Sequence, residues 1–171
     1  MEIKLSRCVL RPWQHGDAVS LVRHANNRNV SGNLRDRFPF PYTAADAKAW
    51  LDRASVESPA LNFAIVVDGA AAGGIGLEMG EDVFRKSAEI GYWLGEPFWG
   101  RGIATEALRA VTDYAFASFD IIRLEAGVFG WNPASARVLE KAGYTLDGRM
   151  RRGVVKDGRV GDRLIYGLVR P

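Results

Sequence analysis

The residues with the clearest chemical potential are two glycines on either side of an arginine, Gly100, Arg101 and Gly102. They lie where a strand-like segment, 87–94, gives way to a long helical pattern. Because glycine has no Cβ, the backbone N–H groups of such a turn can point outward to an anion, and the positive end of the helix dipole adds to the attraction. Arg101 contributes a full positive charge. We therefore predict that 98–105 binds a pyrophosphate group.

Two better-known phosphate loops differ from this segment. A dinucleotide-binding loop needs G-x-G-x-x-G directly after a strand. Here the sixth position is Thr105, and four residues, 96–99, separate the strand from the first glycine. A P-loop needs Gly-Lys followed by Ser or Thr, which does not occur in this sequence. A helix start that only needs glycines to turn stays open as the alternative.

The helical pattern after the glycines has one apolar face. Residues at 3–4-residue spacing form it: Ile103, Ala107, Leu108, Val111, Tyr114 and Ala115. Such a face is buried in a globular domain. Burial of this face would fix the helix N-terminus beside the glycine turn.

The composition is that of an ordinary globular domain. The chain has 171 residues, 47% hydrophobic and 25% charged, and we expect a single domain over 1–171. It has no run of eighteen apolar residues and no signal-peptide pattern, so we expect a cytoplasmic protein without a membrane partner. Cys8 is expected to be a buried hydrophobe, and neither His15 nor His24 has a second metal ligand at helical spacing. The net charge of +3 suits an anionic small ligand, and DNA binding is not expected.

Alternation of apolar residues predicts an α+β fold. Strands are expected at 5–11, 62–67, 72–79, 87–94, 123–128 and 164–169, and helices at 17–24, after Thr43, from 103 and after Asn132-Pro133. Strands 87–94 and 123–128 flank a crossover helix and must run parallel, within a mixed, mostly antiparallel sheet. Gly73, Gly74 and Gly76 are expected to weaken regular pairing of their strand.

Two polar segments complete the pattern. The segment 26–42 is rich in Asn, Arg, Gly and Pro, and we predict a long loop with a helical turn that acts as a functional lid. Thr43 and Asp46 form a T-x-x-D capping pattern at the start of the next helix. The dipeptide Asp157-Gly158 predicts the turn of a last hairpin.

Two segments together resemble the GNAT superfamily of N-acetyltransferases. The first, WGRGIA at 99–104, is similar to the cofactor motif Q/R-x-x-G-x-G/A except at its first position. The second, NPASARVLEKAGY at 132–144, is similar to a helix motif of the family. The tryptophan, with AEIGYWL before it and TEAL after it, is typical of the RimJ/RimL-type branch, whose founding members acetylate the N-termini of ribosomal proteins. The resemblance runs from Leu10 and implies a single-domain fold with two splayed parallel strands flanked by helices.

The resemblance implies acetyl-coenzyme A as cofactor. In this family the pyrophosphate lies on the glycine turn, and the pantetheine arm pairs with the strand at 92–94 like an added strand. The predicted contacts are Tyr92, Trp93, Leu94, Trp99, Gly100, Arg101, Gly102, Ile103, Ala104, Thr105, Asn132, Ser135 and Lys141. The alternatives are a helix N-cap for Asn132 and a solvated surface position for Lys141.

The resemblance also suggests catalytic residues. Many GNAT enzymes protonate the leaving thiolate with a tyrosine, but Leu139 stands at that position. The RimL-type branch carries a serine one turn earlier, so Ser135 is predicted to donate the proton or orient the thiol; the alternative is a serine that only favours helix initiation. Glu89 alternates with Ile90 and is predicted to act as base through a water, unless it only pairs with an arginine. A backbone N–H near Leu94 is predicted to stabilise the oxyanion.

The acceptor is the least constrained part of the prediction. An α-amine has a reference pKa of about 7.7–8.0 and a lysine about 10.4, so a protein N-terminus needs little base for direct attack in a ternary complex. We expect the acceptor to lie between loop 26–42 and the terminal hairpin, whose strand edges could also pair two copies into a homodimer. A protein N-terminal amine is favoured. A small-amine or antibiotic acetyltransferase, a non-catalytic acyl-coenzyme A-binding protein and an RNA-associated module stay open.

Overall fold

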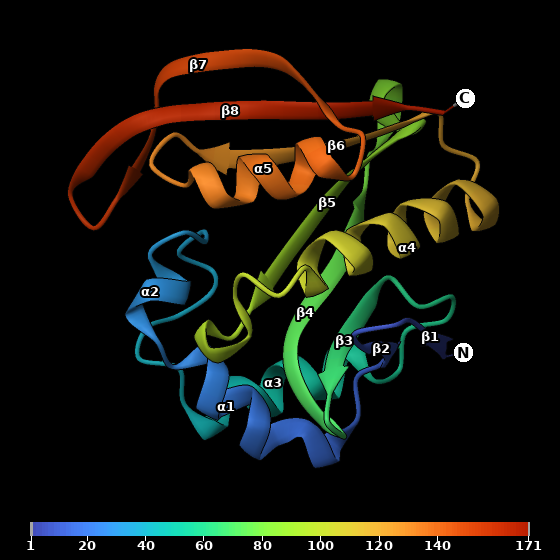
Figure 1. Ribbon diagram of the computed structural model, residues 1–171, viewed down its shortest axis with the longest axis vertical. Helices are drawn as coiled ribbons and strands as arrows, with labels where there is room; N and C mark the ends of the chain where they lie inside the picture. Colours follow the sequence, from blue (N-terminus) through green and yellow to red (C-terminus); the bar gives the residue numbers. More distant parts are fainter. Residues whose placement is uncertain (1, 171) are drawn as a thin grey trace.

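The computed structural model describes residues 2–170, which form a single-domain α+β fold around one sheet (Figure 1). The strands are β1 (Ile3–Lys4), β2 (Val9–Pro12), β3 (Asn62–Val67), β4 (Ala70–Met79), β5 (Ser87–Leu94), β6 (Arg123–Phe129), β7 (Thr145–Lys156) and β8 (Arg159–Val169). The helices are α1 (Ala18–Ala25), α2 (Arg28–Ser31), α3 (Ala44–Ala54), α4 (Ile103–Ser118) and α5 (Pro133–Lys141). The strand order is β1-β2-β3-β4-β5-β6-β8-β7.

The middle of the sheet contains the predicted parallel pair. β5 and β6 pair in parallel only at Ser87 with Arg123, Ala88 with Leu124, and Glu89 with Glu125, whereas the other neighbouring strands are antiparallel. Beyond these three pairs β5 and β6 separate, as Figure 1 shows. The prediction of a mixed, mostly antiparallel sheet with two splayed strands is confirmed.

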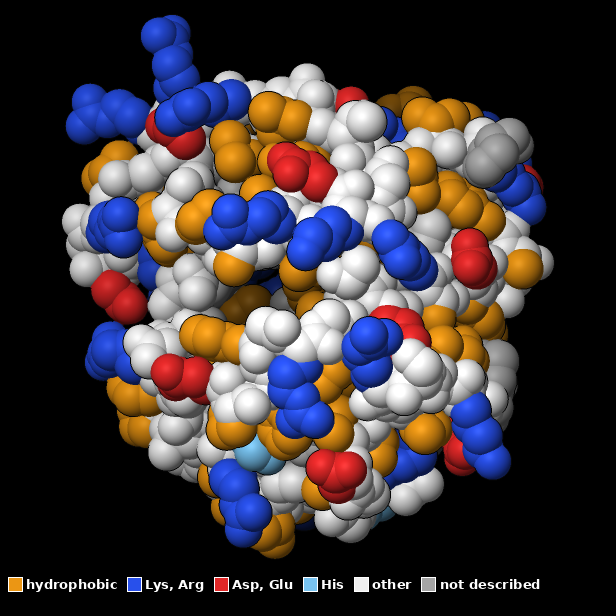
Figure 2. Space-filling view, viewed as in Figure 1, with side chains coloured by type: hydrophobic (Ala, Val, Ile, Leu, Met, Phe, Trp, Pro, Cys, Tyr) orange, Lys and Arg blue, Asp and Glu red, His pale blue; other side chains and the backbone are white. Residues whose placement is uncertain are grey.

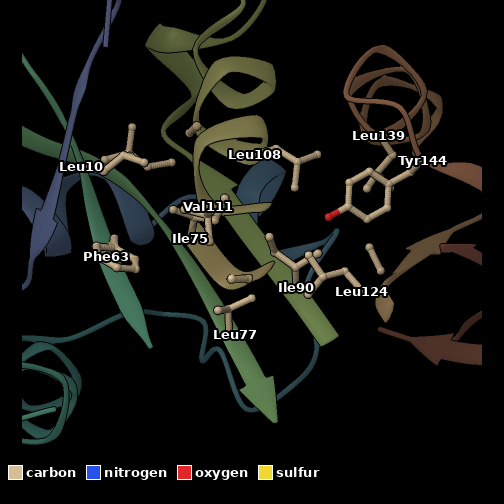
Figure 3. Close-up of a cluster of buried hydrophobic side chains, with 14 of the residues drawn as sticks. Leu10, Phe63, Ile75, Leu77, Ile90, Leu108, Val111, Leu124, Leu139 and Tyr144 are labelled. Atoms are coloured by element: carbon tan, nitrogen blue, oxygen red, sulfur yellow. The ribbon is translucent and has the colours of Figure 1, made fainter. Parts of the chain in front are cut away.

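The helices cover both faces of the sheet. On one face, α4 and α5 pack on even-numbered residues of β5 and β6, and Figure 3 shows Leu108 and Val111 of α4 facing Ile75 and Ile90 of the sheet. Complete burial of such a side chain contributes about 1.5–3 kcal/mol. On the other face, α1 and α3 pack against a second cluster that includes Trp13. The sheet therefore separates two compartments that meet only where β5 and β6 diverge.

Helix termini follow the predicted caps. Thr43 Oγ1 accepts the Asp46 N–H at 3.2 Å while the Asp46 carboxylate accepts the Thr43 N–H at 2.7 Å, which is a complete capping box at α3. At α5, Asn132 Oδ1 accepts the Ser135 N–H at 3.3 Å. Gly143 follows this helix at φ 96°, a conformation that favours glycine. The long loop 26–42 contains α2, so the predicted helical turn is confirmed.

The N-terminal strand prediction was wrong in its extent. Residues 5–8 form a turn closed by a 2.9 Å bond from the Leu5 N–H to the Cys8 carbonyl. The N–H groups of Ser6 and Arg7 donate to the Glu106 carboxylate of α4 at 3.0 and 2.9 Å. Because these donors are satisfied by a side chain, they do not need a strand partner. Cys8 is buried as predicted, and burial raises the pKa of its thiol to about 11.

The glycines of β4 weaken its pairing on one side only. The strand pairs regularly with β5 from Gly73 to Met79, whereas its register toward β3 shifts between Ala71, which pairs with Val66, and Gly73, which pairs with Ile65. The prediction of weakened pairing is therefore confirmed toward β3 and wrong toward β5. A Cβ at Gly73 would lie 2.3 Å from the Trp93 carbonyl oxygen, so the glycine permits a close approach of β5.

None of the helices within 2–170 has both the length and the apolar character needed to span a bilayer.

Candidate active site

The predicted anion site is a turn of left-handed glycines at the start of α4. Gly100 and Gly102 have φ angles of 72° and 77°, and Gly102 is the N-cap residue. The first N–H bonded inside the helix is that of Glu106, which donates to the Gly102 carbonyl at 3.1 Å. The N–H groups of residues 103–105 therefore lack helical acceptors and point out of the helix start. The Glu106 carboxylate is held by residues 6 and 7, which keeps it from competing with a bound anion.

These amides line a cleft of about 1120 Å³ that reaches both faces of the sheet. All predicted site residues line it: Glu89, Tyr92, Trp93, Leu94, Trp99, Gly100, Arg101, Gly102, Ile103, Ala104, Thr105, Asn132, Ser135 and Lys141. Figure 2 shows a hollow in the middle of this face, with Lys and Arg side chains around it. The structure thus brings together residues from β5, the glycine turn and α5.

Backbone groups of β5 face the gap between the splayed strands. The Gly95 N–H donates to the Ala72 carbonyl at 2.7 Å. In an antiparallel ladder the next residue toward the strand interior has its N–H and C=O on the opposite side, so those of Leu94 point away from β4. The Leu94 carbonyl accepts the indole N–H of Trp99 at 2.7 Å. The backbone N–H of Leu94 therefore faces the gap, where the predicted oxyanion would form.

Trp93 and Trp99 both make contacts within the protein. The indole N–H of Trp99 is engaged by Leu94, so this side chain braces the turn against β5. Trp93 pairs with Gly74 of β4, and its ring lies on the face opposite α5, 5.3 Å from the ring of Phe38. Tyr92 and Leu94 are therefore the residues of β5 that face the helix side of the gap. Cofactor contact by either tryptophan stays a prediction.

Ser135 is hydrogen-bonded to a second hydroxyl that the sequence reasoning did not assign to catalysis. Its Oγ lies 2.8 Å from the Tyr92 Oη, which is also 3.2 Å from the Ser135 carbonyl oxygen. Burial raises the pKa of Tyr92 to about 12, so it stays protonated at neutral pH. Leu139, at the position of the family tyrosine, is fully buried. The alternation of β5 predicts that Tyr92 lies on the face opposite Glu89, but it does not identify Ser135 as its partner.

The remaining polar predictions are placed as follows. Asn132 caps α5 through the Ser135 N–H, which is the alternative considered from the sequence. Lys141 and Arg137 both line the cleft from α5, and the latter was missed. Arg101 lies over the Phe98 ring, 5.7 Å from its centroid, at the mouth of the glycine turn. Three cations therefore surround the part of the cleft where phosphates are expected.

The opposite compartment is bounded by loop 26–42. Arg35 of this loop forms an ion pair with Glu89, and Arg37 pairs with Glu78 at 2.8 Å. Glu78 and Glu89 face each other across β4 and β5. The arginine pairing of Glu89, one of the two interpretations left open, is present, and its role as base stays a prediction. The loop closes over this face of β5 as a lid would.

The fold and the cleft define a class of protein. Free amides and cations, which are groups that can bind phosphates, lie next to two parallel strands that separate, with hydroxyl groups beside the gap. This is the arrangement of an acyltransferase that draws its acyl group from a coenzyme A thioester. The chain belongs to the GNAT acetyltransferase family: residues 7–145 match the domain described as "Acetyltransferase (GNAT) domain". The resemblance noted in the sequence is confirmed, and the protein is an acyltransferase.

Individual relatives agree with this family. The chain is 30% identical to the uncharacterized N-acetyltransferase p20 of Bacillus licheniformis over 170 residues, 96% of this chain and 93% of that protein. It is 43% identical to the probable N-acetyltransferase YjcK of Bacillus subtilis over 86 residues, 50% of this chain and 48% of that protein. The match therefore spans about half the length of YjcK.

A solved structure shares the whole fold. The structure described as RimL, a ribosomal L7/L12 alpha-N-protein acetyltransferase in complex with coenzyme A, superimposes with a TM-score of 0.86. The superposition covers 99% of this chain and 98% of that chain, at 22% sequence identity. At this identity the likeness shows the common fold.

Proposed function

We propose that this protein transfers an acetyl group from acetyl-coenzyme A to a primary amine, with a protein N-terminal α-amine as the favoured acceptor. The observation that carries the proposal is the continuity of the cleft, from the free amides of residues 103–105 to the gap at Leu94 and Ser135. Acetyl-coenzyme A is the cosubstrate, since the superimposed RimL structure holds coenzyme A in this fold. The amides and Arg101 suit its pyrophosphate, and the backbone groups of β5 suit its amide-containing arm.

The chain's residues have separate roles in the proposed reaction. The acceptor amine attacks the thioester carbonyl in a ternary complex, and the Leu94 N–H donates to the oxygen on which negative charge develops. When the C–S bond breaks, Ser135 donates a proton to the departing sulfur at the positive end of the α5 dipole. Tyr92, at 2.8 Å, passes a proton to Ser135 and takes one in turn from water in the cleft that it lines, so both hydroxyls are restored. The proton released by the amine leaves through water on the Glu89 side.

Tyr92→Phe tests the hydroxyl pair. We expect kcat to fall about tenfold, which is less than the roughly 100-fold or more typical of a group that transfers the proton directly, because Tyr92 acts through Ser135; the KM for acetyl-coenzyme A should be unchanged. Because burial raises the Tyr92 pKa to about 12, the parent enzyme is expected to show no alkaline decrease in kcat up to pH about 10. Steady-state release of coenzyme A between pH 6 and 10 measures both. An unchanged kcat would remove Tyr92 from the reaction.

Glu89→Gln tests the proposed base. We expect kcat/KM to fall about tenfold below pH 8, where most of the acceptor α-amine is still protonated, and less above it. Glu78→Gln is the matched control, because Glu78 has the same pairing with an arginine on the same face but lies one strand away from the gap. A Glu89→Gln profile identical to the parent profile, or equal losses in both variants, would show that Glu89 only anchors the loop.

The acceptor class is tested by an amine panel. Peptide N-termini, polyamines and aminoglycosides are offered with acetyl-coenzyme A, and release of free thiol is measured. We expect the highest kcat/KM with peptides. Faster turnover of polyamines or aminoglycosides would favour a small-amine enzyme, and binding of acetyl-coenzyme A without release on any amine would indicate a non-catalytic binding protein.

A further inference from the structure

Arg163 of β8 is a cation of the cleft that no carboxylate of the described residues neutralises. It lines the cleft, and it forms no ion pair with any acidic side chain among residues 2–170. Two carboxylates form ion pairs with other arginines: Asp162, the preceding residue, with Arg149, and Glu89 of the cleft with Arg35. A half-buried guanidinium without a counter-charge is costly unless a ligand or water solvates it.

The backbone is shaped to hold this guanidinium. A Cβ at Gly127 of β6 would lie 3.0 Å from Nε and 3.2 Å from Nη2 of Arg163, so the side chain packs flat on a glycine. Only glycine leaves this space without displacing the guanidinium. Across the gap, Gly91 of β5 is also bare, and a Cβ there would meet no atom within 4 Å. Both strands thus leave room at the same level, two residues beyond the last parallel pair of Glu89 and Glu125.

Arg163 lies on the acceptor side of the sheet. Directly paired residues of neighbouring strands share a face, and Arg163 pairs with Phe129 of β6. Phe129 lies on the same face as Gly127 and Glu125, because residues two apart on a strand share a face. Glu125 pairs with Glu89, so all of these residues face away from α5. Ser135 and the glycine turn serve the cofactor from the other face. An acceptor that reaches the gap from the loop 26–42 side therefore passes Arg163.

We propose that Arg163 binds a carboxylate that the acceptor carries close to its reacting amine. This inference rests on the proposed acetyltransferase function and names its substrate class. A guanidinium binds carboxylate through two parallel N–H donors, and it repels an acceptor that carries only positive charges. The carboxylate belongs either to an acidic residue next to a peptide N-terminus or to the α-carboxylate of a free amino acid. Polyamines are disfavoured by the same charge.

The experiment compares matched acceptors with the full chain. A seryl-aspartyl peptide is compared with its seryl-asparaginyl and seryl-lysyl counterparts, and free serine with serinamide. In the parent protein we expect kcat/KM to be about tenfold higher for the acidic member of one pair, which is the size of one charge-assisted hydrogen bond. The pair that shows the preference identifies the source of the carboxylate.

Variants then assign the preference to Arg163. In Arg163→Gln the acidic and neutral acceptors should react within about twofold of each other, and in Arg163→Glu the seryl-lysyl peptide should become the best acceptor. Gly127→Ala should lower the preference by displacing the guanidinium without removing it. Arg159→Gln is the control, because Arg159 lies on the same strand but over the Trp131 ring, 4.6 Å from its centroid and outside the cleft. The dissociation constant of acetyl-coenzyme A should not change in any of them.

Two results overturn the proposal, and they can be distinguished. If the parent protein acetylates neutral and acidic acceptors equally, or if Arg163→Gln keeps the preference, the carboxylate site is wrong while the proposed function stands. If the parent protein releases no coenzyme A with any amine, both fail. A preference lost in Arg163→Gln and reversed in Arg163→Glu, with unchanged cofactor binding, supports the site.

Discussion

Ser135→Ala is expected to lower kcat for acetyl transfer about 100-fold, within the range measured for one general acid. The departing thiolate would then lose both its donor and the hydrogen-bonded path from Tyr92, which lies 2.8 Å from the serine Oγ. The pyrophosphate site lies on a different helix, α4, so the dissociation constant of acetyl-coenzyme A should change by less than about threefold. Stopped-flow or steady-state thiol release with a peptide acceptor measures kcat, and titration calorimetry measures binding.

One matched substitution and one stability measurement make this prediction specific. Ser135→Thr keeps a hydroxyl and should recover part of the activity, whereas a purely structural role would be disturbed by either substitution. The thermal midpoint of Ser135→Ala should stay close to that of the parent, because its helix retains the Asn132 cap, which binds the Ser135 backbone N–H. Turnover of Ser135→Ala within about twofold of the parent would exclude Ser135 from proton donation.

Gly102→Val is expected to weaken acetyl-coenzyme A binding about 10- to 100-fold. Gly102 has a φ of 77°, and a β-branched residue held there costs about 1–3 kcal/mol of strain, part of which the turn would relieve by moving. A Cβ would also lie 3.4 Å from Arg7 Nε. Any movement of the turn reorients the free amides of residues 103–105, and the pyrophosphate loses its donors. Titration with acetyl-coenzyme A measures the change in dissociation constant.

The control for this variant is a glycine with room and without a positive φ. Gly148 of β7 is such a position, since a Cβ there would meet no atom within 4 Å. Gly148→Val should therefore bind acetyl-coenzyme A as the parent does. Equal dissociation constants for Gly102→Val and the parent, with both proteins folded, would contradict the assignment of the glycine turn to the pyrophosphate.

The core strands and the long helix could be predicted from local pattern alone. The bounds of β3 and β5 agree with the predicted strands 62–67 and 87–94, because apolar alternation and flanking turn residues coincide there. The first strand was misjudged because its N–H groups bind Glu106, a residue about 100 positions away whose approach no local pattern reveals. The effect of the β4 glycines was predicted only in part, because the register shift beside Gly73 interrupts the pairing with β3 while the pairing with β5 stays regular.

The site could be predicted where chemistry and sequence position coincide. Gly100 to Thr105 are contiguous, so the residues of the candidate anion site could be named without a fold, and their free amides at the start of α4 fit that prediction. The link between Tyr92 and Ser135 could not, because it joins residues on β5 and α5 that are 43 positions apart. Arg163 could not be predicted for the same reason, because the space for its guanidinium depends on Gly127 of a neighbouring strand. Long-range packing, more than residue type, limits what the sequence can reveal about a cleft.

The most direct measurement is a crystal structure of the protein soaked with acetyl-coenzyme A. We expect the pyrophosphate on the amides of residues 103–105, the pantetheine arm in the gap beside β5, and the thioester sulfur within hydrogen-bond reach of Ser135 Oγ. A ligand bound elsewhere, with the glycine turn empty, would contradict this expectation.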